Sequence, residues 1–337
     1  MSLLPRVIRR VEPFADESVT GFLMRVAHEN NLKSSLEVIR YITGSKSASI
    51  LYNQIPEIAY FCRNTVDEFL QLSGFERWES TEPRWLMQGE WLTKSLFVHN
   101  RTSKMCPVCI SESPYLRALW SLSFYTHCAW HECALQDRCP KCRRTLKWDR
   151  HRPDYCNCLQ YLGAHSLELP QPQSLMLAKL IAYRVTKDSN LIPVQQNNRL
   201  IEHLVRLSID GLCKTIWFLG HCIPELGQYS TGHGKKRPDD VVFEGMVMSA
   251  FDMLKTWPDS MGLILERMIN KELCPQFSSV AFHYFLRPLD HYMKSSLDSQ
   301  ELGFIGHVYE QSLQQIWLKS GRRNSGSRYE KQLRLEF

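Results

Sequence analysis

Four short cysteine and histidine pairs between residues 106 and 158 constrain the fold of this chain more than any other feature. Three pairs have two intervening residues and the last has one: Cys106 and Cys109, Cys128 and His131, Cys139 and Cys142, Cys156 and Cys158. Structural zinc is held tetrahedrally by four Cys or His side chains, and two ligands on one tight turn can face the same ion. A second pair from further along the chain closes such a site. Four pairs therefore predict two zinc ions per chain.

The spacing leaves open which pairs share an ion. Consecutive pairing is the simplest arrangement, with the first two pairs in one site and the last two in the other. A cross-braced arrangement, in which the first pair joins the third, is also compatible with the spacing. The single residue between Cys156 and Cys158 makes a tighter turn, so the second site could instead use His151 or lack a ligand. We interpret three nearby residues as bystanders or as support for the ligands: His127, Cys133 and His165.

The composition favours a cytosolic globular protein. Of the 337 residues, 44% are apolar and 23% charged, and the net charge of +6 permits contact with nucleic acid without requiring it. The start of the chain has no apolar run of signal-peptide type, and no run of about 18 apolar residues predicts a membrane span. Seven of the 12 cysteines fall in the four pairs. This clustering is typical of metal binding rather than of disulfides.

The first of three predicted parts, residues 1–100, has the pattern of a small helical domain. Apolar residues from Val19 to Ala27 recur at helical spacing. Capping-box spacing at Ser34 and Glu37, and again at Thr65 and Glu68, predicts two more helix starts, with ends at Gly44 and Gly74. Short capped helices fit a helix-turn-helix-like bundle. A helical domain that binds no nucleic acid fits the same pattern.

The second part, residues 101–165, holds the tandem zinc-binding region. Alternation of apolar residues and serines from Trp120 to Phe124 predicts a strand, and Leu146 and Trp148 are predicted strand residues. The third part, residues 166–337, is predicted to be a helical C-terminal domain that ends in a flexible basic tail. Its expected helices cover residues 174–186, 198–220, 239–257, 259–272, 278–296 and 302–319. The predicted fold is therefore mainly α, with small β elements of zinc-ribbon type.

Basic residues in three places are candidate nucleic-acid contacts, although each group is also compatible with an ordinary solvated surface. They are an N-terminal arm (Arg6, Arg9, Arg10), a loop (Lys235, Lys236, Arg237) and the tail (Arg322, Arg323, Arg328).

The motifs of common enzymes are absent, so no catalytic residue is predicted. A zinc deaminase needs H-x-E before P-C-x-x-C, but Glu132 directly follows His131, and Arg138 precedes Cys139. The sequence contains no H-E-x-x-H, no phosphate-binding G-x-x-x-x-G-K-[ST] loop and no G-x-S-x-G or G-x-G-x-x-G motif. Both predicted zinc sites have enough ligands to be closed, which indicates structural metal.

Three stretches resemble the TniQ family of target-site adaptors in cut-and-paste transposons. Residues 13–27 read PFADESVTGFLMRVA, close to the family opening P-x-x-D-E-S-L-x-S-W-L-x-R-x-A. Residues 106–142 carry the family order C-P-x-C, Y-x-R-x-x-W, C-x-x-H-x-x-x-L and C-P-x-C, with Leu119-Trp120 at the tryptophan. A weaker third stretch is Phe251 to Pro258. The ending Cys156-x-Cys158 departs from the commoner C-x-x-C.

The resemblance implies a non-enzymatic adaptor in a bacterial cytoplasm, associated with the nucleoid. Such proteins link a target-recognition element to a AAA+ ATPase of the TnsC type, which recruits the transposase. In CRISPR-associated transposons the element is a guide-RNA effector such as Cascade, whereas TnsD-type relatives read target DNA themselves. The length of 337 residues favours the effector-docking type, and a homodimer is compatible with it. A zinc-ribbon transcription regulator outside transposition is the other hypothesis.

Overall fold

The structure, a computed structural model, describes residues 6–44, 49–79, 82–99, 102–163, 169–191, 199–221, 240–269 and 300–321. The chain divides into two compact units. The first comprises Met1–Cys213 and Arg237–Glu244, and the second comprises Lys214–Lys236 and Gly245–Phe337. The three-part division at residues 100 and 165 is a different partition of the chain and stays a prediction.

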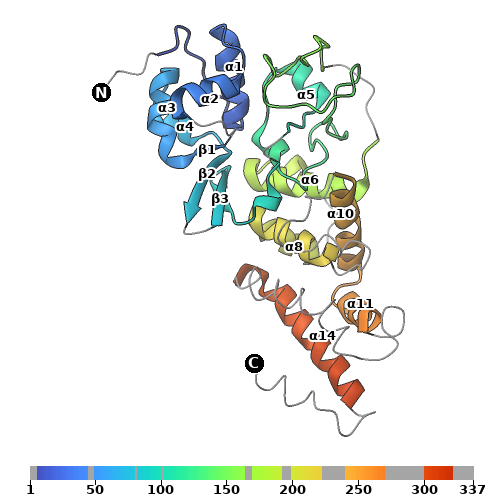
Figure 1. The fold of residues 1–337 in the computed structure, drawn as a ribbon. Coiled ribbons are helices and arrows are strands. Elements are labelled where there is room, and N and C mark those ends of the chain that lie inside the picture. Colours follow the sequence, from blue (N-terminus) through green and yellow to red (C-terminus); the bar gives the residue numbers. More distant parts are fainter. Residues whose placement is uncertain are drawn as a thin grey trace. The chain divides into compact units, whose positions relative to one another are not determined.

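The first unit opens with four short helices, three of which begin at polar side-chain caps (Figure 1). Ser18 and Ser34 accept hydrogen bonds from backbone amides three residues later, and Thr65 forms a full capping box with Glu68. The predicted helix starts are thereby confirmed. The helices are α1 (Val19–Glu29), α2 (Ser35–Thr43), α3 (Ile55–Cys62) and α4 (Val66–Leu70). Because α1 packs on α2 and α3 on α4, the bundle is compatible with a helix-turn-helix, and that interpretation stays a prediction.

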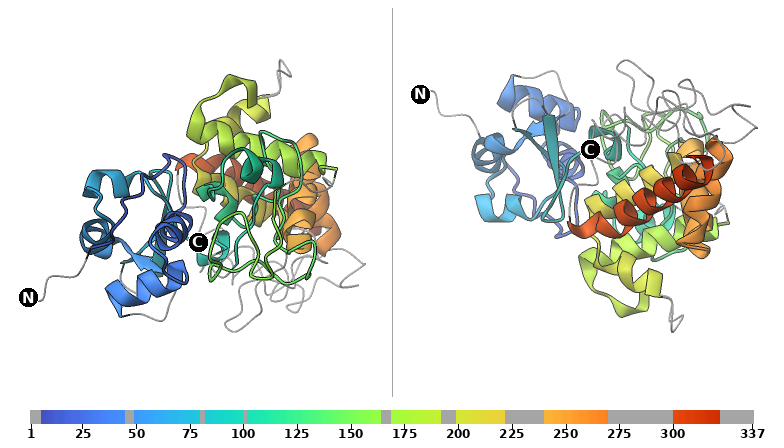
Figure 2. Two further views of the ribbon diagram at one scale, coloured as in Figure 1. Left: turned by 90° about the horizontal axis from the view of Figure 1, so that it is seen from above. Right: turned by 90° about the horizontal axis from the view of Figure 1, so that it is seen from below.

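A four-stranded sheet lies among these helices, where the sequence predicted helices alone (Figures 1 and 2). Its strands are β1 (Ile50–Leu51), β2 (Phe75–Glu79), β3 (Glu82–Met87) and β4 (Glu90–Leu92). They follow the order β1-β2-β3-β4, with β1 parallel to β2 and the other pairs antiparallel. Phe75 faces Leu86 across the central pair, and both side chains are buried.

Helices and sheet share one apolar core, which accounts for the amphipathic spacing of the sequence. Phe22 of α1 and Phe69 of α4 meet edge to face at 5.3 Å between ring centroids. Other members are Val19, Leu23, Val26, Val38, Ile39, Ile50, Ile58, Phe75 and Leu86.

The cysteine region contains less regular structure than the sequence predicted. Its helical pieces are α5 (Pro107–Glu112) and the 3-10 turn η3 (Ala118–Ser121). The predicted strand around residues 120–124 is wrong, since Val98 and Leu122 form only a single bridge there. Leu146 and Trp148 are buried but lie in no strand. Isolated bridges take the place of the expected ribbon strands, although the fold class itself, mainly helical with small β elements, is confirmed.

Helices after residue 170 buttress the cysteine region and the sheet of the first unit. They are α6 (Pro172–Thr186), the 3-10 turn η4 (Ser189–Leu191) and α7 (Arg199–Arg206). Lys179 of α6 pairs with Glu132 at 2.5 Å, and Arg184 pairs with Glu90 of β4 at 2.8 Å. The same Glu90 accepts a hydrogen bond from the amide of Ile209 at 2.7 Å, so it also holds the start of α8 (Ile209–His221).

The helix predicted over residues 198–220 is divided in two. Ser208 lies between α7 and α8, and its hydroxyl accepts a hydrogen bond from the amide of Gly211 at 2.9 Å. A serine in that position caps a new helix.

The second unit is helical as predicted. It contains the end of α8, most of α10 (Asp240–Lys255), α11 (Asp259–Ile269), the 3-10 turn η6 (Gln300–Leu302) and α14 (Gly303–Gly321). Helix α11 packs on α14, as Figures 1 and 2 both show. Phe218 meets Tyr309 edge to face at 5.6 Å between ring centroids. The helix predicted at 278–296 and the basic tail lie outside the described residues. None of the described helices combines the length and apolar character needed to cross a membrane.

Candidate metal centres

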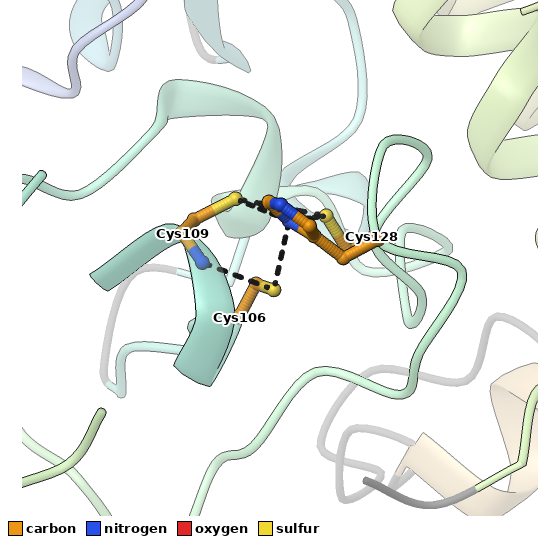
Figure 3. A group of neighbouring side chains, drawn as sticks. Cys106, Cys109 and Cys128 are labelled. Carbon is orange, nitrogen blue, oxygen red and sulfur yellow. Dashed lines mark hydrogen bonds between the residues drawn. The ribbon is translucent and has the colours of Figure 1, made fainter. Parts of the chain in front are cut away.

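The first two cysteine and histidine pairs converge on one point at the start of α5 (Figure 3). The Sγ atoms of Cys106, Cys109 and Cys128 and a ring nitrogen of His131 all lie within 4.8 Å of one another. Cys106 is the N-cap of α5, and Pro107 fills the first helical turn. This helix start directs both cysteines of the first pair to the same side, while Cys128 and His131 approach on a loop. We call this set the first tetrad.

The separations within the first tetrad fit a zinc ion. Tetrahedral ligands at ordinary zinc distances stand about 3.8 Å apart for two sulfurs and about 3.6 Å for sulfur and nitrogen. The Sγ atoms of Cys109 and Cys128 are 3.7 Å apart. His131 Nδ1 is 3.6 Å from the Sγ atoms of Cys106 and Cys128 and 3.2 Å from that of Cys109. Three thiolates and one imidazole form a closed donor set of structural type.

Glu112 orients the histidine of the first tetrad. Its Oε1 lies 3.1 Å from His131 Nε2, so the ring can donate that proton to the carboxylate while Nδ1 faces the sulfurs. A carboxylate in this role fixes the tautomer of a metal-bound histidine. Sequence reasoning did not find Glu112. The signal was available, because Glu112 lies three residues after Cys109 on the same short helix.

The crowded sulfurs favour a cation electrostatically. Hydrogen bonds from Cys109, Cys128 and Cys133 lower the pKa of Cys106, whereas the contact with Cys106 raises the pKa of Cys109. A divalent ion offsets the repulsion that keeps the other thiols protonated, so metal binding releases protons here.

The last two pairs form a second tetrad composed of cysteines alone. The sulfurs of Cys139 and Cys158 are 3.7 Å apart, as are those of Cys142 and Cys156, and all four lie within 4.8 Å of one another. The structure thus groups the pairs consecutively and not in the cross-braced arrangement. Cys158 belongs to the group despite its single-residue spacing. Both tetrads are arranged for a metal of zinc type, and the role of each residue as ligand remains our proposal.

Three of the four pairs lie on turns with one backbone design, which we call knuckles. In the knuckle of Cys128, the amide of Cys128 donates to the carbonyl of Cys133 at 2.8 Å and that of Glu132 donates back at 3.0 Å. Glu132 has a positive φ of 49°, and a single bridge joins residues 127 and 134. The knuckle of Cys139 repeats this pattern, with Arg143 at φ 59° and a bridge between residues 138 and 145.

The third knuckle is shorter by one residue. The amide of Cys156 donates to Gln160, four residues on, whereas Cys139 donates to Arg144, five residues on. The left-handed residue is Leu159, and the bridge joins residues 155 and 161. The missing residue accounts for the spacing of one between Cys156 and Cys158. The unusual ending is a contracted form of the same turn.

The other candidate ligands near the tetrads have different partners. His127 is buried, receives a hydrogen bond from the amide of Gln171 at 3.2 Å, and its pKa is lowered to about 4, chiefly by burial. His151 contacts His28 of α1 at 3.2 Å between ring nitrogens and takes no part in the second tetrad. Cys133, in contrast, places its Sγ 3.6 Å from that of Cys106. His165 lies outside the described residues.

The N-terminal arginines are engaged with the protein surface. Arg9 pairs with Glu29 at 3.5 Å, and Arg10 pairs with Glu68 at 2.5 Å. The guanidinium of Arg6 lies 3.9 Å from the ring centroid of Tyr60. Arg6 also lines a pocket of about 290 Å³ with Ile8 and Tyr41. The loop candidates (Lys235, Lys236, Arg237) and the tail candidates (Arg322, Arg323, Arg328) lie outside the described residues. A nucleic-acid role for any of these residues stays a prediction.

Residues 13–27 contact residues 115–118, in the segment between the two ligand pairs of the first tetrad. Asp16 accepts hydrogen bonds from the hydroxyl of Tyr115, at 2.8 Å, and from the guanidinium of Arg117. The backbones join as well, through Ser18 N to Leu116 O at 2.9 Å and Ala118 N to Asp16 O at 2.8 Å. The two stretches that carry the family resemblance are therefore one structural joint.

Aromatic rings and guanidinium groups extend this joint toward the knuckle of Cys128. Phe14 stacks on Tyr115 at 4.2 Å between centroids, and Arg25 covers the outer face of the pair at 4.5 Å from Phe14. On the other side Arg117 lies 5.2 Å from the ring of Tyr115 and 4.5 Å from that of Trp130. We call these five residues the stacked joint. Most of these residues belong to the sequence motifs, but the motifs do not indicate that their side chains contact one another.

A family comparison covers the stacked joint and the first tetrad together. Residues 8–135 match the TniQ family. That range includes α1 to α4, the sheet, the stacked joint and the whole first tetrad, and it ends just after the knuckle of Cys128. The chain has no significant match among curated proteins. The part of the chain over residues 8–135 is therefore a TniQ family domain.

Proposed function

We propose that this chain is a non-enzymatic adaptor of transposition. It would connect a target-recognition complex, a guide-RNA effector of Cascade type, to a TnsC-like AAA+ regulator and so to the transposase. The observation that supports this proposal is the TniQ domain over residues 8–135, whose motif residues form the stacked joint beside the first tetrad. A densely bonded joint of this kind suits an adaptor, which holds two partners in a fixed relation and catalyses no reaction.

The charge distribution of the N-terminal arm favours docking on a protein complex over direct reading of DNA. Arg9 and Arg10 are neutralised by glutamates, which leaves less positive charge for phosphates. Target-site reading of the TnsD type is accordingly the second candidate, and a zinc-ribbon transcription regulator is the third.

The metals would be structural in this function. The first tetrad offers three cysteines and a histidine, and the second offers four cysteines. Each set would fill all four positions on a zinc ion and leave none open for substrate. What zinc supplies when bound is folding free energy for a region with few strands or helices of its own. Cys106, Cys109, Cys128 and His131 would hold one ion, and Cys139, Cys142, Cys156 and Cys158 the other.

The deciding experiment is a pull-down with the tagged, zinc-loaded chain and the products of neighbouring genes. We expect co-purification of a TnsC-like ATPase and of a guide-RNA complex. A matched pair of variants controls for folding: Cys106→Ser, in the first tetrad, should lose both partners, and Cys62→Ser, a buried cysteine outside both tetrads, should keep them. Absence of any transposition protein among the captured partners would count against the adaptor.

A mobility-shift assay separates the adaptor from a TnsD-type reader. The docking proposal expects no shift of a DNA duplex by the chain alone at physiological salt. A specific shift that weakens steeply with salt would transfer the proposal to direct DNA reading. Binding to a promoter, with no transposase or ATPase gene nearby, would favour the transcription regulator.

A further inference from the structure

The first tetrad has a fifth soft donor beside it. Cys133 Sγ lies 3.6 Å from Cys106 Sγ, close to the edge of about 3.8 Å that separates two sulfurs on one zinc ion. Its side chain is 1% exposed. Among the described residues, Cys133 is the one cysteine outside both tetrads for which such a contact with a ligand sulfur is found.

The knuckle does not require a cysteine at this position. In each knuckle, the residue whose carbonyl receives the hydrogen bond from the first cysteine takes part in the turn through its backbone. That residue is Arg144 in the second knuckle and Gln160 in the third, and both are polar residues outside their tetrad. Cys133 at the equivalent position therefore adds a thiol that the turn itself does not need.

The histidine of the first tetrad is the ligand most open to solvent. Its side chain is 22% exposed, and the carboxylate of Glu112 that orients it is 59% exposed. The three cysteines are buried. Thus the donor that water and competing acids reach most easily lies two residues from a buried thiol in the same loop.

We propose that Cys133 is a reserve ligand of the first tetrad, able to replace His131 and convert a site of three cysteines and one histidine into a site of four cysteines. The inference depends on metal occupancy of that tetrad. In the exchange, Cys133 Sγ would take the ligand position that His131 Nδ1 gives up on a bound metal. Cys133 gives up its thiol proton, which the released imidazole or water accepts. The site gains one negative charge, and no electron is transferred.

Cobalt(II) substitution of the full chain tests this exchange, because visible and near-ultraviolet absorption reports the number of thiolates on the metal. Wild type should bind two cobalt ions, with thiolate absorption from one three-thiolate site and one four-thiolate site. His131→Ala should still bind two ions, with its ligand-field bands shifted to longer wavelength and thiolate absorption increased by one ligand. His131→Ala combined with Cys133→Ser should lose one equivalent and keep the spectrum of the second tetrad.

Two controls assign each outcome. Combining His131→Ala with Cys62→Ser removes a buried cysteine outside both tetrads and should leave both ions bound. Cys133→Ser alone should match the wild-type spectrum, because His131 is then the ligand in both. Loss of one ion from His131→Ala alone, an unchanged number of thiolates in it, or failure of that variant to fold would overturn the proposal. Fewer than two ions in the wild type would instead refute occupancy.

Discussion

Glu17 is a carboxylate with no solvent exposure at the start of α1. Arg25 pairs with both of its oxygens, at 2.9 and 3.1 Å, and the amide of Phe14 donates to it at 3.2 Å. Burial nevertheless raises the pKa of Glu17 from 4.5 to about 7, against the lowering effect of Arg25. Desolvation is therefore the larger effect at this carboxylate.

This shift predicts a pH dependence of stability. Folding takes up a proton between pH 4.5 and about 7. The contribution of Glu17 is therefore full below 4.5 and is lost as the pH rises through 7, at a slope of at most about 1.4 kcal/mol per pH unit. Glu17→Gln should remove this component. Urea unfolding of both proteins at pH 5.5 and 7.5 measures the difference, and identical pH dependence in the two would contradict the assignment.

Gly21 is required because α1 approaches Leu116 closely, in the segment between the two ligand pairs of the first tetrad. A Cβ there would lie 2.8 Å from Leu116 Cβ and 2.8 Å from the hydroxyl of Ser18, which caps the helix. We expect Gly21→Ala to lower the free energy of unfolding by about 1–3 kcal/mol. Thermal unfolding provides the measurement.

A second helical glycine is the control for that substitution. Gly262 of α11 has only Ser312 Oγ, at 3.9 Å, near the position of a new Cβ. Alanine there should raise stability by up to about 1 kcal/mol through helix propensity. A loss of stability at Gly262 equal to that at Gly21 would show that the close approach is not the cause.

Among the elements, the contracted third knuckle depends on a left-handed residue. Leu159 has φ 65° and is 84% exposed. Packing of its side chain therefore does not offset the strain of the left-handed conformation. Leu159→Gly should keep the second tetrad and stabilise the loaded protein by up to about 1 kcal/mol. Leu159→Val should weaken it, because a β-branched residue is poorly compatible with positive φ. Metal transfer to a chelator and melting temperature report both effects.

The matched control is Leu169, which is 91% exposed and lies outside the three knuckles. Leu169→Val should leave chelator transfer unchanged. Faster transfer from Leu159→Gly than from the wild type would mean that the leucine side chain contributes to the second tetrad in another way.

Local signals explain which elements could be predicted from the sequence. The helix starts at Ser34 and Thr65 depend on bonds within four residues, so their pattern is visible in the chain. Strands β2 and β3 were missed because residue type does not alternate with exposure there. In β2 Glu76 is buried and Trp78 is 56% exposed, and in β3 the consecutive residues 85–87 are all buried. The predicted strand at 120–124 failed for a related reason. Ser123 is buried and bonds to the carbonyl of Leu96, so the alternation of residue types was not one of exposure.

The eight candidate ligands could be predicted from the sequence, whereas most of the residues that surround and contact them could not. Metal-ligand spacing is local, so all eight tetrad residues could be read from the chain. Glu112 lies three residues after Cys109, a helical spacing that could have revealed it, whereas the contact of Cys133 with Cys106 spans 27 residues and no ligand spacing indicates it. The contact of Asp16 with Tyr115 likewise joins residues too far apart for any periodic pattern to reveal.

For the whole molecule, metal content is the central prediction. Elemental analysis should give two zinc ions per chain, and Cys139→Ser should lose one without disturbing the first tetrad, because the two sets share no ligand. Cys106→Ser should unfold the cysteine region, since structural zinc supplies folding free energy there. Near-ultraviolet circular dichroism of both variants is the measurement. A native spectrum and retained partner binding in Cys106→Ser would refute the structural role of the metal.

The stacked joint also determines the order in which the chain can fold. Phe14 and Asp16 find their partners, Tyr115 and Arg117, only after about a hundred further residues have been made. Contacts between residues so far apart in sequence carry a large loop-closure entropy cost and form late in folding. They therefore slow the folding of a helical bundle whose other contacts are mostly local. A nascent chain that stops near residue 100 exposes half of this interface. The joint therefore couples the N-terminal helices to the first tetrad, and we expect the two to reach their final form together.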